Sequence, residues 1–447
     1  MDTAALVAEA PPIIETHSRR PALLHRALVF PLKFAWGMIF CQGFLGSILV
    51  VGWTYRLAQR AALKFWWSRR AESLRGVSLE NFLMTSERTK QHRNWPNWFL
   101  QQNFREAIRR PERRAPALRP SDRFAQSWSS ALRLARALAH SLWLNFWIGL
   151  RAISNTWILT LTACLFWWFG WYDGWNNSFN KGYEQAPVGP LISILGIVLF
   201  IAAMFYVPLA QARQAVTGEW RAFFQFRLIW LILRRRWISS VGLALLYSLF
   251  AVPLNVLKTS PMFQPQTNPA LANLTDAQVL KHLNSYFFWC ALVALPAYVL
   301  LRLVAARIYA AGILQLVQTA RITPADLSPL ECETLERLGL LVARPMPERH
   351  FFVRFVAWTG TRVGRVASTV ALVFIWFSFI AQIYISEFFH YHRGLGWMNQ
   401  PLVQLPWFHY VPARLKNPWG DISLAILVFL LASLIAKSAQ AFRSRRE

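Results

Sequence analysis

Residues 188–210 read VGPLISILGIVLFIAAMFYVPLA and contain no charged side chain. A helix needs about 20 apolar residues to cross the hydrocarbon core of a membrane, and this run is long enough. The next stretch, 211–236, reads QARQAVTGEWRAFFQFRLIWLILRRR and carries six arginines against a single glutamate. An uncharged crossing followed at once by a basic segment is typical of a helix that leaves the membrane on its cytoplasmic side.

The same pattern recurs along the chain, and the composition agrees with it. Only 15% of the residues are charged, against about 25% in a typical soluble protein, while the net charge is +27 and the mean hydropathy +0.29. These values exclude a disulfide-rich secreted scaffold, a disordered chain and an ordinary cytosolic enzyme. The sequence therefore predicts an all-α fold, a polytopic bundle of about seven transmembrane helices with a range of six to eight. The predicted crossings are residues 34–55, 153–172, 188–210, 237–257, 286–301, 366–389 and 422–436.

The loops between these crossings alternate between basic and nearly neutral. Residues 56–151 carry nineteen Lys or Arg against six acids and residues 302–365 carry nine Arg, whereas loops 173–187 and 258–285 hold one and two Lys. Cytoplasmic loops of membrane proteins are enriched in Lys and Arg. We therefore expect the basic loops and the C-terminus to lie in the cytoplasm, and the protein to lie in a bacterial inner membrane.

This topology divides the chain into six regions. An odd number of crossings places the basic N-terminal tail outside, so residues 34–55 form either one crossing or a hairpin that bends at Gly37, Gly43 or Gly46. The expected regions are a polar N-terminal tail (1–33), a first transmembrane segment (34–55), a basic cytoplasmic loop (56–152), a membrane domain with four crossings (153–301), a cytoplasmic insert (302–365), and two C-terminal crossings with an outer loop and a basic tail (366–447).

Three basic stretches, at 57–76, 124–151 and 218–236, are predicted to form amphipathic helices at the cytoplasmic surface. Their aromatic side chains would lie among the lipid headgroups, and their bases would contact anionic phosphates, worth about 1 kcal/mol for each well-placed base. In the third stretch, Gly218 interrupts the preceding helix and Thr217 can cap a new one. The side chains expected to contact lipid phosphates are Arg60, Lys64, Arg221, Arg227, Arg234, Arg235 and Arg236.

A short compact helix is predicted inside the cytoplasmic insert. Ser328 and Glu331 form a capping box, Pro329 occupies the first helical position, and Gly339 ends the helix. A segment of this size is too small for a catalytic domain. We expect it to dock against the membrane domain.

Two stretches resemble a known family. ARQAVTGEWRAFFQFRLIWLILRRRW follows a crossing that ends in MFYVPLAQ, and VGWTYRLAQRAAL places a Gly-aromatic pair before an arginine. Together they resemble a widespread family of uncharacterised bacterial and archaeal multi-pass membrane proteins, over about residues 30–320. The resemblance implies a helical membrane domain and brings no established activity, so it assigns no functional residue.

Residues 171–185, WYDGWNNSFNKGYEQ, form the densest polar cluster on the predicted outer side. Amides and acids beside Trp and Tyr suit the binding of a sugar or a lipid headgroup. They suit equally a structured turn in the interfacial aromatic belt, which we favour because the tryptophans are spread over every interface. The residues of a substrate site here would be Asp173, Asn176, Asn177, Lys181 and Glu184.

A second polar cluster, EFFHYHRGLGWMNQPLVQLPWFHY, spans residues 387–410. Glu387, His390 and His392 could hold a metal ion if His409 folds back toward them. The pattern lacks a second acidic ligand and is therefore weak. We predict no metal and no other cofactor.

The expected function follows from what the sequence lacks. The predicted crossings contain almost no ionisable side chain, which argues against ion-coupled transport, and there is no P-loop, G-x-S-x-G, HExxH or Rossmann pattern. The basic loops show no nucleic-acid-binding pattern, so we expect membrane lipids, anionic on the cytoplasmic side, and a membrane-protein partner instead of nucleic acid. The sequence thus favours a non-enzymatic scaffold or lipid-organising protein. The alternatives are a permease or flippase for a lipid-linked or polyol substrate, using the outer cluster, and a metal-dependent membrane enzyme.

Overall fold

The computed structural model describes residues 31, 34–84, 120–169, 188–342, 350–388, 402–408 and 415. The chain divides into two units, Met1–Trp36 and Gly37–Glu447. Of the first unit only residues 31 and 34–36 are described, and they are helical. All regular elements in the described ranges are helices, which confirms the predicted all-α class.

The second unit is built from long helices. These are α2 (Phe44–Trp67), α6 (Pro120–Phe169), α8 (Val188–Thr217), α10 (Trp237–Thr267), α12 (Asp276–Gln318) and α14 (Phe351–Phe388). The shorter elements are η1 (Glu72–Leu74), α3 (Leu79–Met84), η3 (Trp220–Phe224), α9 (Phe226–Arg235), α11 (Pro269–Ala272), η4 (Pro324–Asp326) and α13 (Pro329–Arg337).

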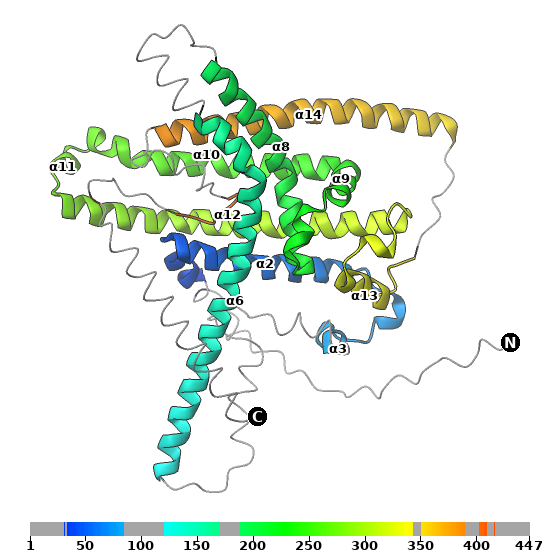
Figure 1. Cartoon of the computed structure of the whole chain (residues 1–447), viewed down its shortest axis with the longest axis horizontal. Coiled ribbons are helices and arrows are strands. Elements are labelled where there is room, and N and C mark those ends of the chain that lie inside the picture. The colour runs from blue at the N-terminus through cyan, green and yellow to red at the C-terminus, as the bar shows by residue number, and fades with distance from the viewer. Residues whose placement is uncertain are drawn as a thin grey trace. The chain divides into compact units, whose positions relative to one another are not determined.

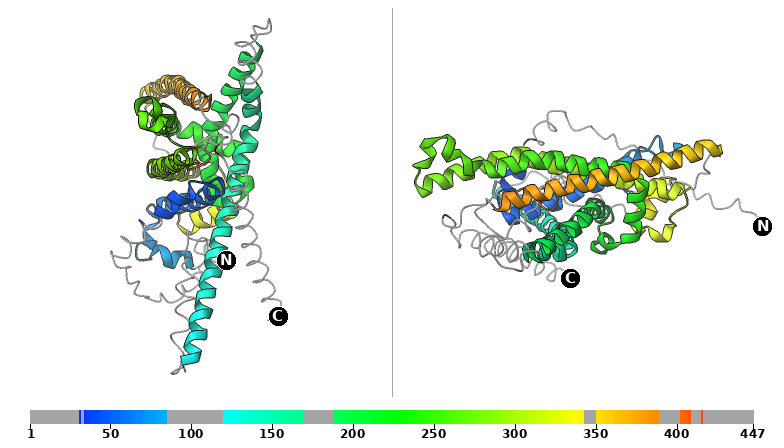
Figure 2. Two further views of the ribbon diagram at one scale, coloured as in Figure 1. Left: turned by 90° about the vertical axis from the view of Figure 1, so that its left-hand side faces the viewer. Right: turned by 90° about the horizontal axis from the view of Figure 1, so that it is seen from above.

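Two sets of helices cross within this unit. Helices α2, α10, α12 and α14 run roughly alongside one another, while α6 and α8 cross them steeply (Figures 1 and 2). Helix α2 packs against α6, α8 and α12, and α10 packs against α12 and α14.

Four of the described helices are long and apolar enough to cross a membrane. The candidate spans are Ser141–Phe166, Leu191–Thr217, Trp237–Pro261 and Asp276–Gln318. They coincide with the four crossings predicted between residues 153 and 301. The crossing predicted at 366–389 falls in α14, where only the backbone is described beyond residue 375, and the one at 422–436 lies outside the described residues. The count of seven crossings stays a prediction.

The first predicted crossing, 34–55, is not a single helix. It is helical at residues 34–40, bends at residues 41–43 and continues as α2. A Cβ atom on Gly46 would lie 2.1 Å from the carbonyl oxygen of Phe40, so only glycine allows the backbone this close approach after the bend. The bend that the glycines permitted is therefore present.

The prediction of an amphipathic surface helix at 57–76 is wrong for residues 57–67. These residues are the last part of α2, and one side of the helix is buried there against the protein interior. The indole of Trp66 donates to the carbonyl of Ala310 (3.0 Å), and Gln59 Nε2 donates to that of Val216 (3.2 Å). These bonds hold α2 against α12 and α8, and Arg60 lies on the exposed side.

The interfacial helix predicted at 124–151 is likewise part of a longer element, because α6 runs without a break from Pro120 to Phe169. Its residues from Ser141 onward pack on α2. A Cβ on Gly52 would lie 1.8 Å from the carbonyl oxygen of Asn145, and one on Gly149 would lie 1.9 Å from that of Ile48. The two glycines let the helices approach closely, which buries a stretch that the sequence pattern placed at the surface.

The helix predicted at 218–236 is divided in two. Gly218, with a φ of 74°, ends α8, and the 3-10 helix η3 is separated from α9 by Gln225. The capping box predicted at Ser328 and Glu331 is confirmed at the start of α13, and Gly339, with a φ of 66°, follows that helix.

Candidate functional site

The interior of the protein contains buried arginines. Arg56, Arg213 and Arg302 are 8%, 0% and 3% exposed. All three were predicted to lie in cytoplasmic loops, because they stand one to three residues beyond the predicted crossings. The prediction of loops is wrong, since α2, α8 and α12 continue past these positions. Arg213 and Arg302 lie inside two of the four candidate spans, where an ionisable side chain is costly and is a functional candidate by default.

The first of the two buried groups is the Arg302 site, which consists of Arg302, Tyr298, Tyr55, Gln211 and the segment 402–408. Arg302 Nη2 donates to the hydroxyl of Tyr298 (2.8 Å) and to the carbonyl of Val403 (2.8 Å). The guanidinium carbon lies 4.8 Å from the ring centre of Tyr298 and 5.7 Å from that of Tyr55. Aromatic faces stabilise a cation at such distances, most strongly where water is excluded.

The segment 402–408 is the unexpected part of this site. It reads LVQLPWF, was predicted to lie in an outer loop, and is instead buried and non-helical. Its backbone oxygens are bonded by side chains of the helices: Tyr298 donates to the carbonyl of Gln404 (3.3 Å), and Gln211 donates to that of Val403 (3.4 Å). Irregular backbone at membrane depth is tolerated only where protein or a watery cavity satisfies its polar groups. Here Arg302, Tyr298 and Gln211 satisfy them.

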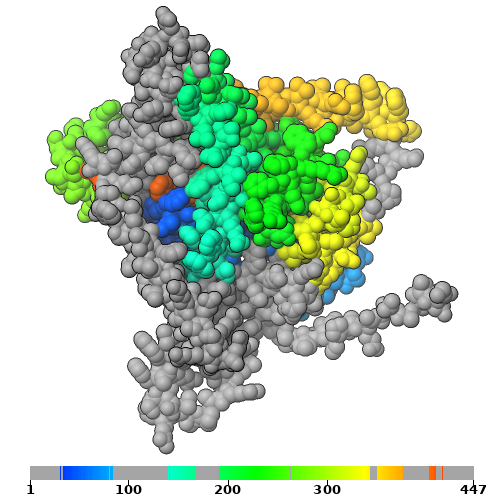
Figure 3. Space-filling model, viewed as in Figure 1, coloured from blue at the N-terminus to red at the C-terminus, as the bar shows by residue number. Residues whose placement is uncertain are grey.

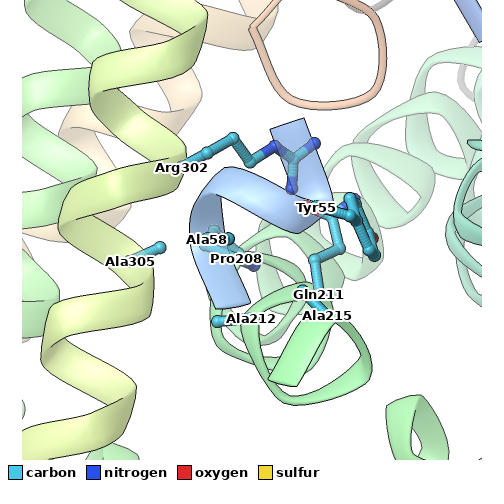
Figure 4. A pocket seen from close by; sticks show the side chains of 8 residues that line it. All are labelled: Tyr55, Ala58, Pro208, Gln211, Ala212, Ala215, Arg302 and Ala305. Carbon is cyan, nitrogen blue, oxygen red and sulfur yellow. The ribbon is translucent and has the colours of Figure 1, made fainter. Parts of the chain in front are cut away.

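Several polar atoms of the Arg302 site have no hydrogen-bond partner among the described residues. They are Arg302 Nε and Nη1, Tyr55 Oη and Gln211 Oε1. Three of these side chains border a narrow crevice that has no room for a water molecule, and its other walls are small: Ala58, Pro208, Ala212, Ala215 and Ala305. Figure 4 shows the guanidinium of Arg302 pointing toward Tyr55, with Gln211 alongside. The crevice is well below the volume of about 300–1,000 Å³ that a drug-sized ligand requires.

The second buried group is the Arg213 clamp, which consists of Arg213, Tyr309 and Glu331. Arg213 Nη1 donates to the Tyr309 hydroxyl (2.9 Å) and pairs with Glu331 Oε2 at 3.4 Å, and both charged side chains are fully buried. Tyr309 in turn donates to Glu331 Oε1. Because Glu331 belongs to α13, the clamp fastens this short helix to α8 and α12.

The elements η3 and α9 lie at the surface of the molecule next to α13 (Figure 3), and their exposed side chains are basic and aromatic. Arg221, Arg227, Arg234 and Arg235 are exposed, as are Trp220 (46%) and Trp230 (53%), whereas the opposite side of α9 is buried through Leu228, Ile229, Ile232 and Leu233. Of the other predicted lipid contacts, Arg60 and Lys64 are exposed on α2, and Arg236 donates to the carbonyl of Ala311 (3.3 Å). The α9 surface therefore has the composition of an interfacial helix.

Both polar clusters singled out in the sequence lie outside what the structure describes. Asp173, Asn176, Asn177, Lys181 and Glu184 fall in residues 170–187, and His390, His392 and His409 fall in the ranges 389–401 and 409–414. Glu387 stands near the end of α14, with only its backbone described. The described ranges hold no group of three His, Cys, Asp or Glu side chains that could bind a metal ion. The two clusters stay predictions.

The fold and the site together define an all-helical protein with four helices able to cross a membrane and two buried arginine groups between them. No protein family, curated protein or solved structure matches the chain. The resemblance drawn from residues 30–320 stays a prediction.

Proposed function

We propose that the chain is a multi-pass protein of a bacterial inner membrane and acts there as a non-enzymatic scaffold that binds anionic lipid at its cytoplasmic surface. The α9 surface carries the proposal. It presents four exposed arginines beside two exposed tryptophans, while its other side is fixed to the protein interior by four apolar side chains. A base near an anionic leaflet is worth about 1 kcal/mol, so the cluster would hold the lipid contacts in one place relative to the insert.

The lipid contact is tested by neutralising Arg227, Arg234 and Arg235 together to Gln. Arg236 is left intact because its side chain bonds the α12 backbone. The purified proteins are placed in nanodiscs of phosphatidylcholine with phosphatidylglycerol, and the bound phosphatidylglycerol is counted by native mass spectrometry. We expect the triple variant to retain fewer anionic lipids than the wild type. Lys281→Gln, which removes an exposed base at the other end of α12, is the control and is expected to behave as wild type. Equal retention by all three proteins would refute the lipid contact.

The orientation is tested by labelling with a membrane-impermeant maleimide. Cys41, Cys164 and Cys290 are buried, so Cys332→Ser provides a background with low reactivity. Arg235→Cys is expected to react only after the cells are opened, and Lys281→Cys in intact spheroplasts. The reverse pattern would place the α9 surface outside and remove the cytoplasmic scaffold.

A permease or flippase is the second candidate, and the Arg302 site favours it. A buried arginine in a candidate span, next to non-helical backbone, is a common arrangement in transport proteins. The crevice is too small for a polyol, so transport would require segment 402–408 to move. A membrane-protein partner, recovered in stoichiometric amount by gentle purification, would support the scaffold instead.

A further inference from the structure

We propose that the Arg302 site binds one small oxyanionic group, and that this group is a phosphate, which phospholipid headgroups carry. This inference is independent of the α9 surface, since it concerns a buried position on different helices. Its basis is the mismatch between the charge of the site and the partners that the structure provides.

The first step is the missing counter-charge. No carboxylate among the described residues forms an ion pair with Arg302, although the side chain is 97% removed from solvent. Its contacts are tyrosine rings, one tyrosine hydroxyl and one backbone carbonyl. Buried charges in proteins are normally paired or bound to a ligand, because an isolated one is strongly unfavourable. The site is thus short of one negative charge.

The second step is the set of free donors. Arg302 Nε and Nη1 and Tyr55 Oη are all buried and find no acceptor in the described part of the chain. All three are able to donate, and a guanidinium with a nearby hydroxyl matches the oxygens of a phosphate or a carboxylate. A neutral ligand or a cation would leave the charge of Arg302 uncompensated.

The third step is the space. Arg302, Tyr55 and Gln211 form the polar side of the crevice and four alanines and a proline form the rest, and the space between them is too small for a water molecule. An oxyanion from a lipid headgroup or from solution would therefore bind by displacing the side chains of Arg302, Tyr55 and Gln211.

The experiment uses the full-length protein in neutral detergent, with ligand binding measured as the rise in unfolding temperature. The probes are inorganic phosphate, with chloride at equal ionic strength as the reference, and phosphatidylglycerol in mixed micelles, with phosphatidylcholine as the reference. Stabilisation by phosphate identifies a free anion. Stabilisation by phosphatidylglycerol alone identifies a lipid headgroup. Absence of both effects overturns the proposal.

Three variants localise the effect. Tyr55→Phe keeps the ring and removes one donor to the anion, so the apparent affinity is expected to fall about tenfold. Arg302→Met is expected to abolish the response to phosphate, and to leave only the part of the phosphatidylglycerol response that the α9 surface contributes. Arg307→Gln neutralises an exposed arginine on the same helix and is expected to respond as wild type. If Arg302→Met does not fold, Tyr55→Phe decides alone, and an unchanged affinity in that variant contradicts the site. The α9 triple variant is expected to keep the response, which separates this proposal from the scaffold proposal.

Discussion

The Arg213 clamp and the Arg302 site place the same side chain in the same interior with different partners. Arg213 meets a carboxylate that is as deeply buried as itself, and the phenol of Tyr309 bonds to both. Arg302 meets two tyrosine rings, one tyrosine hydroxyl and one backbone carbonyl, and two of its nitrogens remain without a partner in the described ranges. The clamp is electrically complete and joins three helices. The Arg302 site is incomplete, which is what distinguishes a place for a ligand from a structural ion pair.

The strongest test of this contrast is Glu331→Gln. The variant leaves Arg213 buried without a counter-charge, and breaking a buried pair in this way costs about 3–5 kcal/mol. The unfolding temperature in detergent is therefore expected to drop sharply, with the insert opening to proteolysis. Replacing both partners, Arg213→Met with Glu331→Leu, removes the stranded charge and is expected to recover most of the loss. A stable Glu331→Gln protein would show that the clamp does not hold the insert.

The matching change at the other site is Arg302→Met, measured without phosphate or anionic lipid. It removes two hydrogen bonds but also an uncompensated charge, so we expect a net loss of only about 1–2 kcal/mol. The comparison depends on the difference between the two variants. A destabilisation as large as that of Glu331→Gln would mean that Arg302 is structurally as essential as Arg213, and the distinction drawn above would fall.

The two buried groups also show how much of the structure could be predicted from the sequence. Each of the four crossings predicted between residues 153 and 301 overlaps a helix long and apolar enough to span a membrane, because long uncharged runs have few alternatives to a buried helix. Their ends were misplaced because an arginine that follows an apolar run in the sequence normally marks the point where a helix leaves the membrane. Arg213 can be buried because it pairs with Glu331, which lies 118 residues further along the chain. Arg302 can be buried because it bonds the carbonyl of Val403, which lies 101 residues further along. No local pattern contains that information.

The composition of segment 402–408 already indicates that the segment is buried. LVQLPWF has no charge and one polar side chain, which is unusual for a loop facing water. It was predicted to lie in the outer loop between the crossings at 366–389 and 422–436. Short apolar stretches between prolines and polar clusters can instead enter a bundle as irregular backbone, provided that side chains such as Arg302 and Gln211 bond it.

The smallest expected effect is a pH dependence of the unfolding temperature that arises at η4, beside the Arg213 clamp. At η4, the backbone N–H and the hydroxyl of Thr323 donate to Asp326 Oδ2 (2.9 and 3.0 Å), and these bonds hold the pKa of Asp326 below its ordinary value. A lowered pKa in the folded protein means that the contribution is fully present above about pH 4 and is lost as the pH falls through the folded-state value. Since Asp326 is largely exposed, the contribution is below about 1 kcal/mol.

Asp326→Asn tests this on the clamp side, because the carbonyl of Asp326 accepts from Arg213 Nη2 at 3.3 Å. The variant is expected to unfold slightly below the wild type at pH 6, with the difference between the two unfolding temperatures narrowing as the pH falls below about 4. A gap that stays constant with pH would show that the carboxylate charge of Asp326 does not stabilise the turn. In that case only the buried pair, and not its exposed border, would connect the insert to the bundle.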